Sequence, residues 1–449
     1  MHNIDAALAQ EIALFSATHG QSMALSQASA PHFLYSAPMH WMSDWATPHL
    51  IHARSAQDHR LWDVDGHAYL DLCLGDTGAM FGHRPLAIDR VLRQSDAPLT
   101  CMLPSDNLAT VGDALQARFG LSHWQVTLSA SDANRFLIRW ARAITQRPVV
   151  LVFDGCYHGA VDDTLVDWSA QTGVQPRASL LGEVYSHAIH TRVVPFNDLD
   201  ALEVALASHD VACVLAEPAL TNCGLVLPQA DFWIKAQQCC QQHETLLILD
   251  ETHTLSTGLG GYAQQHQLKP DAVVMGKAVA GGWPCGVYGF SADMAAAMMD
   301  AKAHAPAGHS GIGTTLSGNA LSLHALEAAL NHLHQAEPYG AMLATANQLA
   351  QGLSDLLAQH RLPWTLTQLG ARMELQFSAD PPKNAGEARA AQNDKLEHFL
   401  HLFMLNRGVL LTPFHNMMLC APSWTTNELQ QVLNLWDHAL KQVKSMSAS

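Results

Sequence analysis

The chain has 449 residues, of which 48% are hydrophobic and 14% are charged. This length and composition predict a large α/β core with a smaller second domain. The formal net charge is −16 and no basic run occurs, which argues against nucleic acid as a partner, because phosphate binding requires clustered Lys and Arg.

Cysteine use and the N-terminal sequence indicate a cytoplasmic protein. The nine cysteines are odd in number and form no CxxC pair, so we expect free thiols in a reducing compartment and no metal site. The first residues lack the basic and apolar pattern of a signal peptide. No apolar run is long enough to span a bilayer, so we expect no membrane partner.

Short apolar runs alternate with helical segments along the first three quarters of the chain. A helix with amphipathic spacing is predicted over 131–145. Strands are predicted at 124–130, 148–153, 211–218, 245–251, 271–276 and 286–291. Continuous apolar strands separated by helices are typical of a mostly parallel sheet covered on both faces. Ligands of such sheets bind at the carboxyl ends of strands, so Asp250 and Lys277 should face one cleft.

After about residue 325 the pattern predicts a smaller α+β domain. The expected elements are a long helical stretch over 316–335 that continues into 338–360, a strand near 371–379, and helices near 391–408 and after 421–431, with an exposed loop at 379–393. The predicted organisation is an N-terminal segment (1–55) that joins the small domain and dimer contacts, a large domain (56–325) and a C-terminal small domain (326–449).

Lys277 follows the apolar run DAVVMG and stands among glycines. Burial favours the neutral, nucleophilic form of a lysine amine, and such a lysine is suited to a Schiff base with a carbonyl compound. If the carbonyl belongs to pyridoxal phosphate, the ring nitrogen needs an anionic partner. Asp250 ends a strand 27 residues earlier (277 − 250) and could meet the same ring.

Two further segments could hold such a cofactor. Ser129, Ala130 and Ser131 lie between a strand and a helix, where free backbone amides and the helix dipole can bind a phosphate. Tyr157 follows another strand, at a height where its ring could cover a flat cofactor. On its own, Tyr157 is more typical of a core position.

Three other motifs fit their usual functions less well. GHSGIG (308–313) has Ile312 where a nucleophile elbow needs glycine, and no strand precedes it. GLGGYA lies in a loop without the strand-to-helix setting of a dinucleotide site. DETHT lacks the remaining ligands of a metal site, so His253 is expected to be a supporting or structural group. His158 is expected to orient the loop next to Tyr157.

The order of motifs resembles that of class III aminotransferases of the type I pyridoxal-phosphate fold, and is most similar to the glutamate-1-semialdehyde aminomutase branch. The resemblance runs from 61–76 to the C-terminus. Its motifs are GCYHG (155–159), LAEPALTNCG (215–224), LLILDETHT (246–254), the long block 260–289 and GTTLSGNAL (313–321).

The resemblance implies a role for each matching residue. Lys277 corresponds to the lysine that forms the aldimine, Asp250 to the partner of the pyridinium nitrogen, and Tyr157 to the ring that stacks on the cofactor. Ala130 and Ser131 take phosphate-loop positions usually filled by Gly and Thr. The other implied cofactor contacts are Glu217, Asn222, Thr252, which replaces the usual valine, and Thr315, which would reach the neighbouring site of a homodimer.

The substrate pocket departs from the aminomutase pattern. His40 lies nearest to the position of an expected N-terminal arginine, and His415 replaces a glutamate. Thr77, beside Asp76, replaces an aromatic residue, and Thr412 stands where many class III enzymes have an arginine. The segment 167–187 replaces a glycine-rich mobile loop. The predicted pocket residues are Trp41, Asp76, Thr77 and His415.

These features predict a pyridoxal-phosphate-dependent aminotransferase that moves an amino group from an amine or amino acid to a keto or aldehyde acceptor. The alternatives are an intramolecular aminomutase of the glutamate-1-semialdehyde type and an amino-acid racemase or epimerase. A protein that binds the cofactor without catalysis is disfavoured, because Lys277, Asp250, Tyr157 and Thr315 are all present.

Overall fold

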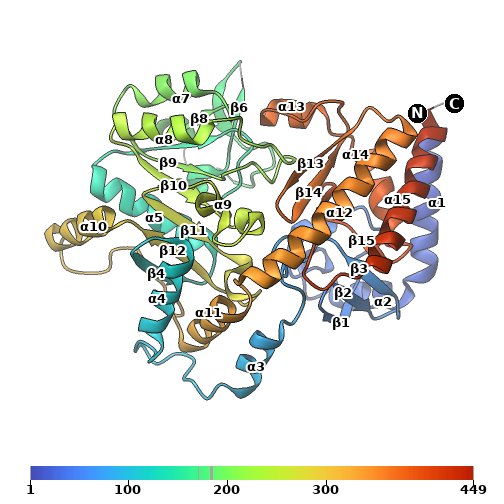
Figure 1. The fold of residues 1–449 in the computed structure, drawn as a ribbon, viewed down its shortest axis with the longest axis horizontal. Helices are drawn as coiled ribbons and strands as arrows, with labels where there is room; N and C mark the ends of the chain where they lie inside the picture. Colours follow the sequence, from blue (N-terminus) through green and yellow to red (C-terminus); the bar gives the residue numbers. More distant parts are fainter. Residues whose placement is uncertain (1, 170, 183–185, 448–449) are drawn as a thin grey trace. The chain divides into compact units, whose positions relative to one another are not determined.

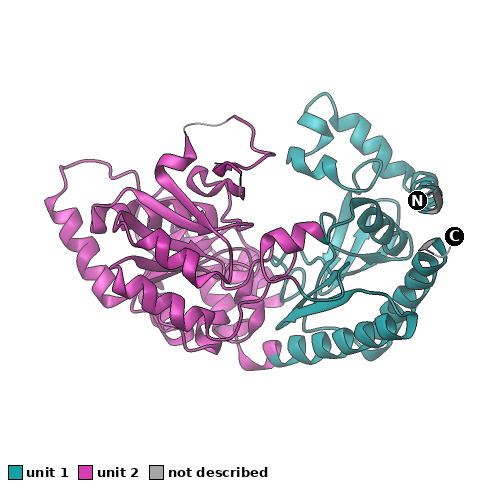
Figure 2. Ribbon diagram, turned by 90° about the horizontal axis from the view of Figure 1, so that it is seen from above, with its two compact units in different colours: residues 1–85, 340–381, 391–449 teal, residues 86–339, 382–390 magenta. Residues whose placement is uncertain are grey.

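The computed structural model describes residues 2–169, 171–182 and 186–447 (Figure 1). The chain divides into two compact units (Figure 2). Unit 1 comprises residues 1–85, 340–381 and 391–449, and unit 2 comprises residues 86–339 and 382–390. The predicted borders near residues 55 and 325, and the predicted dimer contacts, remain predictions.

Unit 2 contains a seven-stranded sheet in the order β4-β12-β11-β10-β9-β5-β8 (Figure 1). The strands are β4 (His123–Thr127), β5 (Val149–Phe153), β8 (Thr191–Val194), β9 (Val211–Ala216), β10 (Leu246–Asp250), β11 (Ala272–Met275) and β12 (Gly286–Phe290). Neighbouring strands from β11 to β8 are parallel, whereas β12 is antiparallel to both β11 and β4. Every residue of β5 and β9 is buried, which explains their unbroken apolar sequences. The predicted α/β fold with a mostly parallel sheet is confirmed.

Helix α5 (Ala130–Thr145) forms where the amphipathic pattern predicts it, and contacts β4, β9, β11 and β12. Its N-cap is Ser129, whose hydroxyl accepts a hydrogen bond from the Asp132 amide at 3.3 Å. The other helices of unit 2 are α3 (Leu86–Gln94), α4 (Leu108–Phe119), α6 (His187–His190), α7 (Leu199–Leu206), α8 (Phe232–Gln242), α9 (Gly261–Gln265), α10 (Ala292–His304), α11 (Ala320–His332) and α13 (Ala385–Ala390). A separate hairpin pairs β6 (Val166–Ser169) with β7 (Gly173–Pro176).

Unit 1 contains two small sheets. The first joins β1 (Ala53–Gln57), β2 (Arg60–Asp63), β3 (Ala68–Asp71) and β15 (Val409–Leu410), and the second joins β13 (Thr365–Leu369), β14 (Arg372–Gln376) and β16 (Met417–Leu419). Its helices are α1 (His2–Thr18), α2 (Gly20–Ser29), α12 (Ala336–His360), α14 (Asp394–Leu405) and α15 (Thr426–Ser447), where the first residues of α12 belong to unit 2. Among the helices of the described residues, none has the length and hydrophobicity required to cross a membrane.

The prediction of an exposed loop over 379–393 is wrong in its middle. Helix α13 occupies Ala385–Ala390 and buries Ala385 and Ala388. It begins with a reciprocal cap, because the Asn384 side chain accepts from the Glu387 amide at 2.9 Å while Glu387 accepts from the Lys383 amide at 2.9 Å. The helical stretch expected over 316–360 is also interrupted, since α11 ends at His332 and α12 begins at Ala336.

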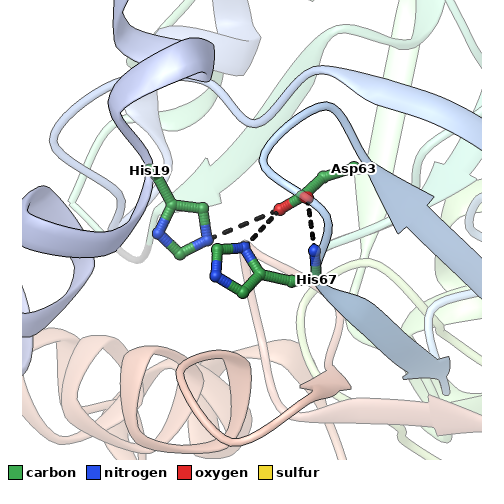
Figure 3. A group of neighbouring side chains, drawn as sticks. All are labelled: His19, Asp63 and His67. Carbon is green, nitrogen blue, oxygen red and sulfur yellow. Dashed lines mark hydrogen bonds and ion pairs between the residues drawn. The ribbon is translucent and has the colours of Figure 1, made fainter.

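A buried polar network joins the end of α1 to the β2–β3 hairpin within unit 1 (Figure 3). Asp63 accepts hydrogen bonds from the Tyr69 hydroxyl at 2.7 Å and from the His67 ring at 2.9 Å. The Nε2 atom of His19 lies 2.9 Å from the Tyr69 hydroxyl oxygen and 3.7 Å from the Asp63 carboxylate. His19 also stacks on Phe15, so the network anchors the N-terminal helix to the hairpin.

This network makes the stability of unit 1 dependent on pH. Burial lowers the pKa of His19 below 6.5, and hydrogen bonds from Tyr69 and His67 lower the pKa of Asp63 although burial alone would raise it. Both folded pKa values lie below the unfolded ones, so the unfolded chain binds more protons in acid. Stability should therefore fall as the pH decreases below about 6.5, first through His19 and then, near pH 4 and below, through Asp63.

We expect the melting temperature to decrease between pH 7 and pH 5, and His19→Gln to reduce that slope. Differential scanning calorimetry at a series of pH values measures both effects. His32→Gln is the matched control, because His32 is exposed and should leave the slope unchanged. Equal slopes for wild type and His19→Gln would contradict the assignment.

Candidate active site

The predicted reactive residues come from adjacent parallel strands of unit 2. Asp250 is the last residue of β10 and is paired in register with Val274 of β11. Lys277 follows β11 and begins the 3-10 helix η5 (Lys277–Ala280). Its amine lies 2.9 Å from Nε2 of His253, in the turn that follows Asp250. The structure thus brings the lysine into contact with the segment that holds the aspartate.

Asp250 is a buried carboxylate surrounded by hydrogen-bond donors. Its Oδ2 atom accepts from His158 Nδ1 at 3.0 Å and from Asn134 Nδ2 at 2.8 Å. Its Oδ1 atom accepts from the amide and the hydroxyl of Thr252, at 3.1 and 2.6 Å. Burial alone would raise the pKa of Asp250, but these donors outweigh burial and lower it. The group therefore remains an anion at neutral pH.

His158 supplies the positive charge next to this anion. Burial alone would lower the pKa of His158, but its interactions with Cys156 and Asp250 raise it to about 10. Asn134 also donates to the His158 carbonyl at 3.0 Å and so links the two residues of the pair. The geometry agrees with the expectation that His158 orients the loop, and adds a direct contact with Asp250.

The N-terminus of α5 lies against the loop that bears Lys277. A β-carbon added at Gly276 would meet the Ala130 side chain at 2.8 Å and its backbone nitrogen at 3.1 Å. The Ser131 hydroxyl accepts a hydrogen bond from the Ala160 amide at 3.2 Å. The first amides of a helix have no intrahelical acceptors, so this end of α5 can bind an anionic group. Ser129, Ala130 and Ser131 all belong to it.

The contact between Gly159 and Ser131 predicts a sensitive position. The φ angle of Gly159 is +82°, and an added β-carbon would lie 1.9 Å from the Ser131 hydroxyl oxygen. We expect Gly159→Ala to destabilise the protein by about 2 kcal/mol or more and to weaken binding of pyridoxal phosphate. Chemical denaturation and cofactor titration measure these effects. Gly112→Ala is the control, because nothing lies within 4 Å of its added carbon; similar losses in both variants would contradict this role.

Glu217 organises the loops that bear Tyr157 and Asn222. Its carboxylate accepts from the Tyr157 amide at 3.0 Å, the Thr221 hydroxyl at 2.6 Å and the Asn222 side chain at 3.3 Å. Burial raises the pKa of Glu217, although these donors oppose the shift. The Tyr157 side chain remains 40% exposed, with the Arg177 guanidinium 6.0 Å from its ring centre. The ring is accessible, and not the core residue that its sequence context alone would favour.

The other predicted residues differ in their surroundings. Thr252 is buried and bonded to Asp250, whereas Thr315 is exposed in the turn before α11. The contact of Thr315 with a neighbouring subunit stays a prediction. In the segment 167–187, for which the replacement of a mobile loop stays a prediction, residues 170 and 183–185 lie outside the described residues.

The four predicted pocket residues belong to unit 1. The Thr77 hydroxyl accepts a hydrogen bond from Arg372, whose guanidinium also lies 3.8 Å from Asp76. The Glu374 carboxylate accepts a hydrogen bond from His415 Nδ1 at 2.9 Å. Trp41 is 39% exposed and packs against Trp45 with ring centres 5.8 Å apart. The structure thus brings Asp76 and Thr77 together through one arginine and pairs His415 with a carboxylate.

Sequence reasoning did not identify Arg372 or Glu374. Arg372 and Glu374 are two positions apart in β14, so their side chains extend from the same face of the strand. All residues of this strand are buried. A buried strand that contains an arginine and a glutamate two residues apart is the signal that could have indicated them. His415 also lines a cavity of about 170 Å³ with Asp44, Glu397, His398 and His401. Burial and the nearby Glu374 raise the pKa of Glu397 to about 7.

Two groups of side chains in the described residues are close enough to share a metal ion. They are His19, Asp63 and His67 in unit 1, and Glu203, Cys239 and His243 in unit 2. Hydrogen bonds within each group account for its arrangement. Neither group includes a predicted active-site residue.

Comparison with known proteins identifies the family. Residues 41–440 match the family Aminotransferase class-III. A glutamate-1-semialdehyde aminomutase from Pseudomonas aeruginosa PAO1 is 42% identical, with a TM-score of 0.95 over 98% of each chain. A lysine-to-alanine variant of such a protein from the same organism, solved in complex with PMP, has a TM-score of 0.96 and is 41% identical over 98% of each chain.

A curated relative gives the same result. Glutamate-1-semialdehyde 2,1-aminomutase from Acidobacterium capsulatum is 32% identical over 82% of this chain and 85% of its own length. The family match, the relatives and the seven-stranded sheet agree. The chain therefore belongs to the class III aminotransferase family, among the glutamate-1-semialdehyde aminomutase-like, pyridoxal-phosphate-dependent enzymes of fold type I.

Proposed function

We propose that this protein is an intramolecular aminomutase of the glutamate-1-semialdehyde type, which exchanges an amino group and a carbonyl oxygen between neighbouring carbons of one molecule. The observation that supports this most is the 42% identity to the Pseudomonas aeruginosa aminomutase over 98% of both chains. It favours the aminomutase over transfer between two substrates, which the sequence alone suggested first.

The residues of unit 2 fit pyridoxal phosphate. Bound there, the cofactor supplies a reactive aldehyde and a ring that stabilises negative charge on the substrate carbon. The anionic Asp250 would face the ring nitrogen, and the free amides at the start of α5 would hold the phosphate. The close approach of Gly276 to Ala130 places the backbone before Lys277 beside those amides. The remaining proposed cofactor contacts are Tyr157, Glu217, Asn222, Thr252 and, from the second subunit of a homodimer, Thr315.

The chain's own groups perform the proton transfers. The Lys277 amine would remove a proton from the substrate carbon that bears the amino group. It would later return a proton to the neighbouring substrate carbon. Asp250, held in its charged form by four donors, would favour a protonated ring nitrogen when the cofactor is bound. Tyr157 would cover one face of the ring and exclude water from it.

Arg372 is a candidate partner for a substrate carboxylate in unit 1. Its guanidinium is buried and contacts the predicted pocket residues Asp76 and Thr77. Guanidinium groups match carboxylates in charge and geometry.

Transfer between two different substrates is the second candidate. The pocket substitutions favour it, since His40 and His415 stand near positions where the aminomutase branch usually has an arginine and a glutamate. His415 is paired with the Glu374 carboxylate beside the cavity that Asp44 and Glu397 line. Such surroundings suit a positively charged or neutral substrate better than a second carboxylate.

Incubation of the holoenzyme with (S)-4-amino-5-oxopentanoate, without any other amine or keto acid, distinguishes the candidates. An aminomutase yields 5-amino-4-oxopentanoate in equal amount, detected by chromatography. Conversion only when a keto acid is added, with formation of the corresponding amino acid, would overturn the proposal in favour of an aminotransferase. Return of the other enantiomer would indicate a racemase instead.

A further inference from the structure

We propose that His253 is a catalytic residue that holds the Lys277 amine in position and exchanges a proton with it during amino transfer. The inference rests on the proposed function, because it requires that Lys277 is the reacting lysine. His253 is buried, with 5% of its surface exposed, and its Nε2 atom lies 2.9 Å from the Lys277 amine nitrogen. The sequence alone suggested only a supporting or structural role.

The backbone on both sides of this contact is fixed. Lys277 has a φ angle of +49°, in the left-handed region, and the preceding Gly276 packs against Ala130. The His253 carbonyl accepts from the amide and the hydroxyl of Ser256, at 3.3 and 2.9 Å. The flexible part is the four-carbon side chain of the lysine. The hydrogen bond to the buried imidazole therefore helps to hold the amine in place when no cofactor is attached to it.

The contact also provides a route for a proton. A hydrogen bond between two nitrogen bases holds one proton between them. When the Lys277 amine takes a proton from a substrate carbon, the resulting ammonium can donate to His253 Nε2, and the same proton returns when the neighbouring carbon is protonated. No electrons are gained or lost and no other reactant is needed. Imidazole is suited to this exchange because its ordinary pKa lies near neutrality.

Other charged groups near this turn have separate partners. Asp250 is paired with His158 and receives hydrogen bonds from Thr252. Glu251 accepts from the Thr254 hydroxyl at 2.7 Å and from the amides of Tyr262 and Ala263 at 2.7 and 2.6 Å, so its carboxylate faces α9. The Lys277 amine nitrogen lies 2.9 Å from the Nε2 atom of the His253 ring. The proton exchange that we propose takes place along this contact.

The first test uses the cofactor-free protein. Lys277 acetylation by acetic anhydride is followed from pH 6 to pH 9 by peptide mass spectrometry in wild type, His253→Leu and His253→Gln. We expect His253→Leu to change the labelling rate at Lys277 by about threefold or more and to alter its pH profile. The exposed Lys269 is the internal standard, and His123→Gln, at an exposed position of β4, is the matched control. Identical Lys277 profiles in wild type and His253→Leu would refute the contact.

The second test uses the holoenzyme in single turnovers. In His253→Leu, the absorption of the bound cofactor should change about 10- to 100-fold more slowly after substrate is added. The KM, measured separately at steady state, should change by less than about twofold. His253→Gln, which can position the amine but cannot titrate, should recover part of the rate while losing the ionisation of His253 from the pH profile. A purely structural role predicts a lower melting temperature with an unchanged pH profile, and that result would overturn the proposal.

The outcomes also separate this inference from the proposed function. The role of Lys277 is wrong, and both proposals fail, if wild type with pyridoxal phosphate does not show the absorption of covalently bound cofactor. The same conclusion follows if Lys277→Ala still shows that absorption. If wild type and the His253 variants all bind the cofactor covalently through Lys277 but share one pH profile, only the role of His253 is refuted.

Discussion

Lys277→Ala should lower turnover by about 10³-fold or more and remove the visible absorption of covalently bound cofactor, while the protein stays folded. The amine is the only part of this side chain that can form a covalent bond to the aldehyde and transfer protons at the substrate carbon. The side chain is half-buried at the start of η5, so its truncation should shift the melting temperature by only a few degrees. Product chromatography, absorption spectra and calorimetry measure the three quantities.

Lys269→Ala provides the matched control for this experiment. Lys269 lies exposed just before β11, in the same unit and eight residues before Lys277 (277 − 269). Its truncation should leave turnover and the spectrum unchanged. Borohydride treatment of wild-type holoenzyme should fix the cofactor mass on the peptide that contains Lys277. Fixation on another lysine, or Lys277→Ala turnover above about a tenth of wild type, would show that a different residue binds the cofactor.

The central sheet was predictable because its strands are buried on both faces. Residues Val149–Phe153 and Val211–Ala216 are apolar without interruption and buried throughout. Helix α13 was missed because its stability comes from the reciprocal cap of Asn384 and Glu387 and from two buried alanines, inside a segment whose composition is that of a loop. Local contacts of this kind indicate a helix only weakly in the sequence, whereas the Pro and Asn residues around them strongly indicate a loop.

The arrangement of the candidate residues was predictable where they follow one another along the chain, and not where the fold brings distant residues together. The position of Asp250 and Lys277 at the ends of neighbouring strands follows from strand order. The Arg372 contact with Thr77 spans 295 positions, and no periodicity relates two residues so far apart. The contact of His253 with Lys277 depends on how one short turn bends, which composition does not specify.

Asp250→Asn should lower turnover by about 10³-fold or more and destabilise the protein by about 3 to 5 kcal/mol. Asparagine would remove the charge that we propose keeps the cofactor ring nitrogen protonated. It also replaces one acceptor oxygen by an amino group, which would then face either His158 and Asn134 or the two donors of Thr252. A buried imidazolium would be left without its anion, so the folded state loses stability as well as activity.

Two measurements separate these effects. Denaturation by urea gives the loss of stability, and the absorption of bound cofactor as a function of pH reports whether the ring nitrogen stays protonated. Thr252→Val is the matched control, because it removes one hydroxyl donor at 2.6 Å but keeps the carboxylate, the amide donor and the His158 pair. It should cost about 1 kcal/mol of stability and less than about tenfold in turnover. If Asp250→Asn folds, binds pyridoxal phosphate and turns over like Thr252→Val, the carboxylate does not serve as the counter-ion and must act only through packing.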